Sequence, residues 1–276
     1  MKFFSKIWLA FVLVIPQISQ AALFGVTSSS IVIIDPINTN NVSVVGHHLL
    51  PSDIQLLNTL SYDPSSQKLF GIGYNMSLET SYLLEFDRKT GHGAIAANLG
   101  GFSSGGGFEA IEYVDSLNSL VVSANLPNHG LSQQLLKISG SGLTSPILVT
   151  GLDNDSAVYD SINDLFYTVD PNGAGQLVNV NLNSGVVSNL GSIPLIQDMA
   201  FWQFDASIYS ISVYTNQLYR IQTQNGLAPI SVDLVGTVSG DEIRGLAFAP
   251  HAVPEPNILL LLTTGLLTLA RICRSQ

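Results

Sequence analysis

The sequence predicts an all-β chain folded as a β-propeller with five blades of four antiparallel strands each. Three observations lead to this prediction: a composition suited to short strands, a repeated pattern of strands and turns, and two incomplete repeats that complete each other. The chain has 276 residues, of which 46% are hydrophobic and only 11% charged, and it contains 24 glycines. Such a composition, without long Leu/Ala/Glu/Lys stretches, favours strands joined by polar turns over helices.

The repeated pattern is an apolar strand that ends in an aspartate, then a polar turn and a second apolar strand. It occurs four times, and the aspartates follow one another at spacings of 52, 45 and 45 residues. An Asp side chain can accept hydrogen bonds from the turn that follows it, so we expect the four aspartates to stabilise turns. The copies are TLSYDPSSQKLFGIGY (59–74), AIEYVDSLNSLVVSAN (110–125), SAVYDSINDLFYTVD (156–170) and MAFWQFDASIYSISVY (199–214), with Asp63, Asp115, Asp160 and Asp205.

Each copy is followed by two more predicted strands. The third strands are expected at 81–87, 134–139, 176–182 and 217–223, and each fourth strand ends in a glycine. Four strands per unit at a period of roughly 40–50 residues are typical of propeller blades. We interpret the glycines at the ends of the outer strands as turn residues with positive φ. They are Gly46, Gly100, Gly151, Gly191 and Gly236.

Two incomplete repeats flank the four complete ones. The segments 23–27, 31–36 and 42–46 match the second, third and fourth strands of a blade, and 243–250 matches a first strand. Together they predict a fifth blade that is shared by both ends of the body and closes the ring of sheets. A pair of β-sandwiches and a β-helix are the structural alternatives.

The first and third strands of these units resemble YVTN-type and quinoprotein-like propeller repeats. The match is loose in the residues and good in the period. The resemblance implies the same propeller fold that the repeats predict.

The first 21 residues are typical of a secretory signal peptide. Lys2 and Lys6 form a basic region, a short apolar stretch follows, and Ser19 and Ala21 are small residues at the −3 and −1 positions of a cleavage site. We therefore expect export through the Sec machinery and cleavage after Ala21. An uncleaved membrane anchor is the alternative.

The segment 253–276 combines three features in a fixed order: a Pro-Glu-Pro motif, an uncharged apolar stretch and a short basic cluster. The residues are Val253, Pro254, Glu255 and Pro256 for the motif, and Arg271 and Arg274 for the basic cluster. This order resembles the PEP-CTERM sorting signal of Gram-negative bacteria. An ordinary C-terminal membrane anchor is the alternative.

The PEP-CTERM resemblance implies a route for the protein. The apolar helix would insert transiently in the inner membrane, with the arginines on the cytoplasmic side. An exosortase, a membrane-embedded cysteine transpeptidase, would recognise the Pro-Glu-Pro motif and remove the tail. The protein would then move to the cell surface or the extracellular matrix.

The body between these two segments is strongly acidic. Residues 22–253 contain six Lys/Arg and nineteen Asp/Glu, a balance of −13. Such a charge repels a phosphate backbone and makes nucleic acid a poor partner. It suits basic partners, or cations that bridge to acidic polymers, and it also favours solubility. The only cysteine, Cys273, lies in the tail, so the body has no disulfide and no Cys-based metal site.

The metalloprotease motif HExxH and the P-loop motif GxxxxGK[ST] are absent from the sequence. Acidic residues instead gather in the expected connections from one blade to the next, which meet on one face of a propeller. They predict an acidic rim that could bind Ca²⁺ through carboxylate oxygens, the only cofactor that the sequence suggests. The plain alternative is that exposed loops of an acidic protein contain acids. The rim candidates are Asp53, Glu109, Asp153, Asp155, Asp198, Asp241 and Glu242.

These observations divide the chain into a signal peptide (1–21), a propeller (22–252) and a sorting tail (253–276). PEP-CTERM proteins as a group are linked to exopolysaccharide-producing bacteria. The resemblance therefore implies a non-catalytic binding or structural module in extracellular polysaccharide or biofilm. The alternative is a propeller-based hydrolase or lyase that acts on an extracellular polymer, which needs a metal ring or paired carboxylates in the channel. Glu112, on a first strand, is the one channel carboxylate that the sequence suggests.

Overall fold

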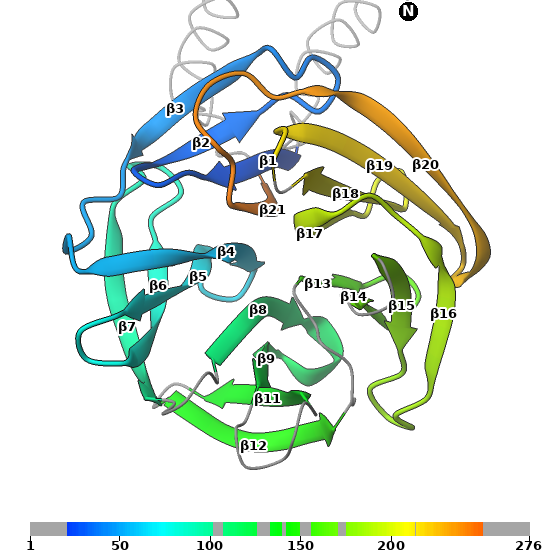
Figure 1. The fold of residues 1–276 in the computed structure, drawn as a ribbon, viewed down its shortest axis with the longest axis horizontal. Coiled ribbons are helices and arrows are strands. Elements are labelled where there is room, and N and C mark those ends of the chain that lie inside the picture. Colours follow the sequence, from blue (N-terminus) through cyan, green and yellow to red (C-terminus); the bar gives the residue numbers. More distant parts are fainter. Residues whose placement is uncertain are drawn as a thin grey trace, which may run out of the picture. The chain divides into compact units, whose positions relative to one another are not determined.

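The structure is a computed structural model that describes residues 21–101, 107–125, 133–139, 142–149, 156–170, 175–212 and 214–250. Residues Ala22–Ala249 form one compact unit. Apart from one short 3-10 helix, η1 (Asp115–Leu117), the regular elements of the described residues are β-strands. They form five four-stranded sheets around a common centre (Figure 1).

Each sheet is a blade whose strands follow one another from the centre of the ring outward. From the inside, the first blade contains β21 (Gly245–Pro250), β1 (Ala21–Val26), β2 (Ser30–Ile34) and β3 (Val42–His47). The second contains β4 (Ile54–Asp63), β5 (Lys68–Asn75), β6 (Thr80–Phe86) and β7 (Gly93–Gly101). The third contains β8 (Gly107–Val114), β9 (Ser119–Asn125), β11 (Gln133–Ser139) and β12 (Gly142–Val149). The fourth contains β13 (Ala157–Asp160), β14 (Leu165–Asp170), β15 (Gln176–Val180) and β16 (Val187–Ser192). The fifth contains β17 (Ile196–Trp202), β18 (Ser207–Ser212), β19 (Gln217–Gln224) and β20 (Leu227–Thr237).

This arrangement confirms the predicted five-bladed propeller and excludes the sandwich and β-helix alternatives. The blade shared by both ends of the body is also confirmed, because β21 is hydrogen-bonded beside β1. On the innermost strand of this blade, the ring of Phe248 stacks on Trp202 of the fifth blade with a centroid distance of 5.0 Å. The closing strand is therefore held both by its own sheet and by the neighbouring blade.

Five clusters of buried apolar side chains lie between successive blades, so the core is a ring of interfaces. Phe24 packs with Leu60 between the first and second blades, and Leu23 packs with Ile211 between the first and fifth. The other three clusters join the second to the third, the third to the fourth and the fourth to the fifth blade. Since burying one such side chain contributes about 1.5–3 kcal/mol, each interface is a substantial source of stability.

The predicted turn role holds for three of the four aspartates. The Oδ1 atoms of Asp63, Asp160 and Asp205 accept hydrogen bonds from the backbone N–H two residues later, at 2.7, 2.9 and 3.1 Å. Asp115 instead begins η1, whose N-terminus has no side-chain cap.

The outer-strand glycines serve two purposes rather than one. Gly100 and Gly191 have φ values of 97° and 132°, as predicted. The prediction of positive φ is wrong for Gly46 and Gly236. A Cβ at Gly46 would clash with the carbonyl oxygen of Thr90, so this glycine permits the close approach of the next blade's outer turn. Gly236 packs in the same way against Thr39, and Gly151 lies outside the described residues.

The antiparallel order gives the propeller two distinct ends. At the upper face, where the inner strands begin, lie the interblade connections 48–53, 193–195 and 238–244 and the loops 27–29, 76–79 and 214–216. At the lower face, where the inner strands end, lie the turns 64–67, 115–118, 161–164 and 203–206. The strand β1 begins and β21 ends at the lower face, because both run antiparallel within the first blade.

Candidate functional site

The inner strands are the free edges of their sheets, so their backbone N–H groups need partners from outside their own blade. Asp198 on β17 is the acceptor for two of these N–H groups. Its Oδ2 atom accepts hydrogen bonds from the N–H of Leu60 on β4 at 2.9 Å and of Leu246 on β21 at 2.8 Å. Asp198 is 0% exposed. One carboxyl group thus connects the fifth blade to the second and the first.

Glu112 on β8 likewise accepts a backbone N–H group from the inner strand of a neighbouring blade. Its Oε1 atom accepts a hydrogen bond from the N–H of Tyr159 on β13 at 3.4 Å, and the Ser61 hydroxyl donates to the same carboxyl group. The Ser61 Oγ atom in turn accepts from the N–H of Tyr113 at 2.8 Å. Thr59, like Ser61 on β4, accepts from an N–H of β8. We call the four acceptors the central clasp: Thr59, Ser61, Glu112 and Asp198.

The clasp carboxyl groups are unusual acids. Burial raises the pKa of Glu112 to about 8, against the opposing hydrogen bonds from Ser61 and Tyr159. Burial also raises the pKa of Asp198 well above its ordinary range; three backbone N–H donors oppose this shift, and the charge of Glu112 adds to it. Desolvation thus favours the neutral form of both groups. With its pKa at about 8, the carboxyl group of Glu112 is largely protonated at pH 7.

Two of the seven predicted rim residues do not lie in interblade connections. Asp198 is inside β17 and Glu109 is inside β8. Both strands begin earlier than the repeat suggests, and each contains a register shift at this point, between Ile196 and Asp198 and between Phe108 and Ala110. Such irregular strand starts interrupt the alternating pattern, so the sequence alone wrongly places these two acids in loops.

The other rim candidates are dispersed. Asp53, on the upper face, accepts a hydrogen bond from Nδ2 of Asn75 at 2.7 Å. Asp241 and Glu242 are exposed in the connection 238–244, and Asp153 and Asp155 lie outside the described residues. Among the described residues, no three His, Cys, Asp or Glu side chains are close enough to hold a metal ion. Calcium binding stays a prediction.

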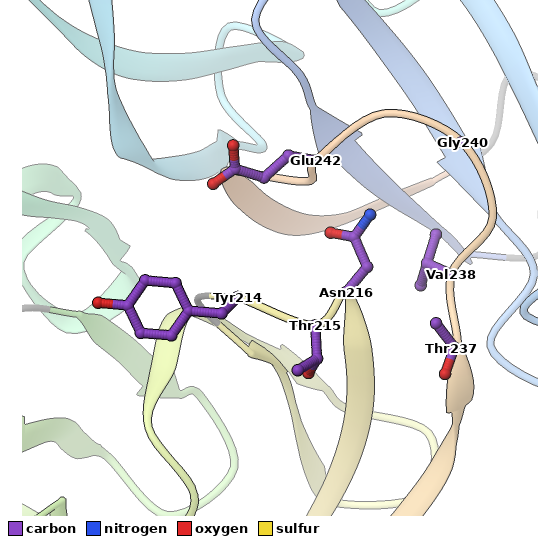
Figure 2. Close-up of a pocket in the computed structure, with 7 residues that line it drawn as sticks. All are labelled: Tyr214, Thr215, Asn216, Thr237, Val238, Gly240 and Glu242. Atoms are coloured by element: carbon purple, nitrogen blue, oxygen red, sulfur yellow. The ribbon is translucent and has the colours of Figure 1, made fainter.

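A pocket of about 510 Å³ opens on the upper face next to the closing blade (Figure 2). It is lined by Tyr214, Thr215, Asn216, Thr237, Val238, Gly240 and Glu242. In Figure 2 the ring of Tyr214 and the carboxylate of Glu242 point to the same side, left in the view, while Val238 and Thr237 lie beyond Asn216. Tyr214 is 85% exposed. The pocket therefore combines an accessible aromatic ring with hydroxyl and carboxylate groups.

The predicted terminal signals fall mostly outside the described residues. This applies to Val253, Pro254, Glu255 and Pro256 and to Arg271 and Arg274. Ala21, the predicted last residue of the signal peptide, is the first residue of β1. Within the part of the chain that the structure describes, no helix has the length and apolar character needed to cross a membrane.

Comparisons with known proteins identify the fold. No protein-family model matches the sequence, and no curated protein matches it. A chain of a nidogen/laminin complex is similar in structure, with 12% identity and a TM-score of 0.53 over 83% of this chain and 98% of that one. A PQQ-bound aldose sugar dehydrogenase from Streptomyces coelicolor has 12% identity and a TM-score of 0.50 over 84% and 83% of the two chains. TolB from Acinetobacter baumannii has 14% identity and a TM-score of 0.50 over 83% and 66%.

At such low identities, these similarities confirm the propeller fold with a quinoprotein-like and a TolB neighbour and say nothing of ligands. The sequence interpretation missed the clasp role of Asp198 and the pocket at Tyr214. A signal existed for the first, since Asp198 is a lone acid within the apolar strand IQDMAFW. None existed for the second, because the exposure of Tyr214 depends on how the loop 214–216 meets the interblade connection 238–244.

Proposed function

We propose that this protein is an exported, exosortase-sorted module of the cell surface or extracellular matrix, whose propeller binds extracellular polysaccharide without catalysing a reaction. The order of the Pro-Glu-Pro motif, apolar stretch and arginines supports the sorting route. The binding role rests mainly on one observation: the two carboxyl groups of the central clasp accept backbone N–H groups of neighbouring blades. Because the Asp198 and Glu112 carboxyl groups hold the ring of blades together, we assign ligand binding to a different surface. That surface is the loop-rich upper face, where the pocket opens.

The topology of the first blade favours such a role. The compact unit Ala22–Ala249 begins in β1 and ends in β21, in both cases at the lower face. The pocket lies on the opposite, upper face of the propeller, between the loop 214–216 and the connection 238–244.

A propeller-based hydrolase or lyase acting on an extracellular polymer is the second candidate, and one observation favours it. Glu112 has a pKa of about 8 and is therefore protonated at neutral pH, which is the state that a general acid needs. The charge of Glu112 also contributes to the raised pKa of Asp198, so the two carboxyl groups interact. A catalytic role requires that a substrate reach these groups, whereas Asp198 is fully buried and already bonded to two blades.

The sorting part of the proposal is tested in a Gram-negative host that has an exosortase. The full chain and a Glu255→Ala variant are expressed, and the protein is followed in membrane, surface and medium fractions. We expect the parent protein outside the cell and shortened at its C-terminus, and the variant retained with its tail in the membrane fraction. Equal release of both proteins would exclude recognition of the motif.

The binding part is tested with the mature protein released by such a host. It is mixed with the host's extracellular polysaccharide, with and without Ca²⁺, and co-sedimentation and the size of the polymer are both measured. We expect sedimentation with the polymer and no decrease in polymer size. Depolymerisation that disappears in Glu112→Gln would replace the binding function with the catalytic one.

A further inference from the structure

The pocket at Tyr214 is held in shape by hydrogen bonds between Asn216 and the backbone around it. The Asn216 side chain donates from Nδ2 to the carbonyl oxygen of Asp241 at 3.0 Å, and its Oδ1 atom accepts from the N–H of Ile243 at 3.0 Å. The Asn216 carbonyl oxygen also accepts from the N–H of Val238 at 2.8 Å. One residue thus fixes the connection 238–244 against the loop 214–216. The resulting volume of about 510 Å³ lies within the range of roughly 300–1,000 Å³ that is usual for small-ligand sites.

The aromatic ring in this pocket is unlike other tyrosines of the propeller. Tyr113, Tyr159, Tyr167 and Tyr209 are at most 9% exposed and belong to the interblade clusters. Tyr214 is 85% exposed, so its ring contributes little to the core. An exposed flat apolar surface with a polar hydroxyl tip is suited to contact with a ligand that is itself partly apolar and partly polar. The carbon face of a sugar ring, surrounded by hydroxyl groups, has this character.

The charge next to the ring is negative. Glu242 is half exposed, at 52% of its side chain, and its Oε2 atom lies 3.7 Å from Nη2 of Arg244. Arg244 is the only Lys or Arg in the upper-face segments of the described chain. Of the other five in the body, Lys68, Arg88 and Lys137 lie at or contact the lower turns, Lys89 adjoins Arg88, and Arg220 pairs with Asp233.

The acids of the upper face outnumber this single arginine. Asp53, Glu79, Asp241 and Glu242 belong to its connections and loops. An acidic polysaccharide, such as a uronic-acid polymer, would be repelled from this face unless cations bridged to it. A saccharide with a protonated amine would be attracted to it.

We propose that the pocket binds one sugar unit carrying a free amine within a polysaccharide, with the Tyr214 ring stacked on the sugar face and the Glu242 carboxylate paired with the ammonium group. The inference rests on the proposed polysaccharide-binding function and names its ligand class. Tyr214 and Glu242 both line the pocket, and in Figure 2 both side chains extend to the left of Asn216. An ammonium group near an aromatic ring face gains a further attraction.

The test measures binding of the mature, full-length protein to short oligosaccharides by calorimetry. The probes are a tetramer of glucosamine, its fully N-acetylated counterpart and a tetramer of galacturonate. We expect the glucosamine tetramer to bind at least about tenfold more tightly than either of the others, and less tightly at high salt. Tyr214→Ala should weaken this binding about tenfold. Glu242→Gln should weaken it and remove most of its salt dependence.

A matched control for the aromatic ring is Phe204→Ala, since Phe204 is 61% exposed in a turn of the lower face. It should bind like the parent protein. Equal affinity for the amine and acetylated tetramers, or full binding by Tyr214→Ala, would overturn the inference. A tetralysine peptide that binds as tightly as the glucosamine tetramer, and binds Tyr214→Ala equally well, would assign the face to cationic peptides instead.

The outcomes for the inference and for the proposed function are separable. If the host polysaccharide co-sediments with the protein but the glucosamine tetramer does not bind, the polysaccharide function stands and the amine-sugar site is wrong. If neither binds, both are wrong. If both bind and only the tetramer is lost in Tyr214→Ala, the pocket is one of several contacts with the polymer.

Discussion

Two acidic residues near the closing blade, Asp198 and Glu242, show how carboxyl groups are used in opposite ways. Asp198 is 0% exposed and accepts two backbone N–H groups from other blades. Glu242 is half exposed and has only a loose contact of 3.7 Å with Arg244. The centre of the propeller thus uses an acid to satisfy backbone N–H groups, whereas the acid on the upper face is exposed to solvent. Substitutions at the centre should change stability, and substitutions on the upper face should change binding.

The largest expected effect is on Asp198. Asp198→Ala leaves the N–H groups of Leu60 and Leu246 buried without an acceptor, and we expect a loss of roughly 3–5 kcal/mol in the free energy of unfolding. Asp198→Asn keeps one acceptor oxygen and should lose less. Urea unfolding measures both. The control is Asp241→Ala on the upper face, where we expect a change within about 0.5 kcal/mol. Similar losses for Asp198→Ala and Asp241→Ala would abolish the distinction between centre and face.

The pH dependence of stability tests the other clasp acid. The pKa of Glu112 is raised to about 8 in the folded protein, so the folded state holds its proton more tightly than the unfolded state. The stability that this proton provides is present in full below the unfolded pKa and is lost as the pH rises through about 8. We expect the melting temperature to fall between pH 5 and pH 9, approximately tracking this titration.

Glu112→Gln cannot ionise, so its stability should depend less on pH. Allowing for the partial exposure of Glu112, we expect the variant to exceed the parent protein by on the order of 3 kcal/mol at pH 9. Asp198, whose pKa is also raised, should leave some slope in the variant. Melting curves that remain parallel for both proteins from pH 5 to pH 9 would show that Glu112 does not control this dependence.

A third comparison concerns glycines that touch a neighbouring blade and glycines that do not. A Cβ at Gly46 would meet the backbone of Thr90, whereas a Cβ at Gly107 would have no atom within 4 Å. We expect Gly46→Ala to cost about 1–3 kcal/mol, because the outer turn of the second blade must move away. Gly107→Ala should be nearly neutral, within about 0.5 kcal/mol. Thermal unfolding measures the stability of both variants. Equal losses of stability in Gly46→Ala and Gly107→Ala would contradict this account.

The smallest expected effect is at the lower turns. Asp63 accepts hydrogen bonds from the N–H and hydroxyl of Ser65 and from the hydroxyl of Ser66. These bonds are exposed, so Asp63→Ala should cost only about 1 kcal/mol. As a control, Asp233→Ala removes an exposed ion pair with Arg220 and should cost less. Urea midpoints of the two variants give this ranking, and a larger loss for Asp233→Ala would reverse it.

The ring architecture could be predicted from the sequence because it depends on local patterns. The strand-aspartate-turn units fix the blades one by one, and the incomplete units 23–46 and 243–250 are recognisable as complementary parts. The clasp could not be predicted in the same way. Whether Asp198 meets Leu60 depends on how five inner strands are placed around a centre, which no local spacing encodes.

The upper-face pocket is even harder to predict from the sequence than the clasp. Its shape depends on Asn216, whose side chain bonds two residues more than twenty positions later. The sequence shows Tyr214 as the last aromatic of an apolar strand, a position that would ordinarily suggest burial. In the folded protein the loop 214–216 lies against the connection 238–244, and the ring of Tyr214 is exposed there.

The position of β21 has a consequence for the order in which the molecule can be made. The innermost strand of the first blade is the last strand along the chain. The first blade therefore cannot be completed until residue 250 has left the ribosome. Contacts that span nearly the whole sequence form slowly, since the intervening chain must be ordered first. A nascent chain that cannot close its ring early stays open for longer. This delay would suit the proposed export, in which the polypeptide passes a translocation pore before it folds.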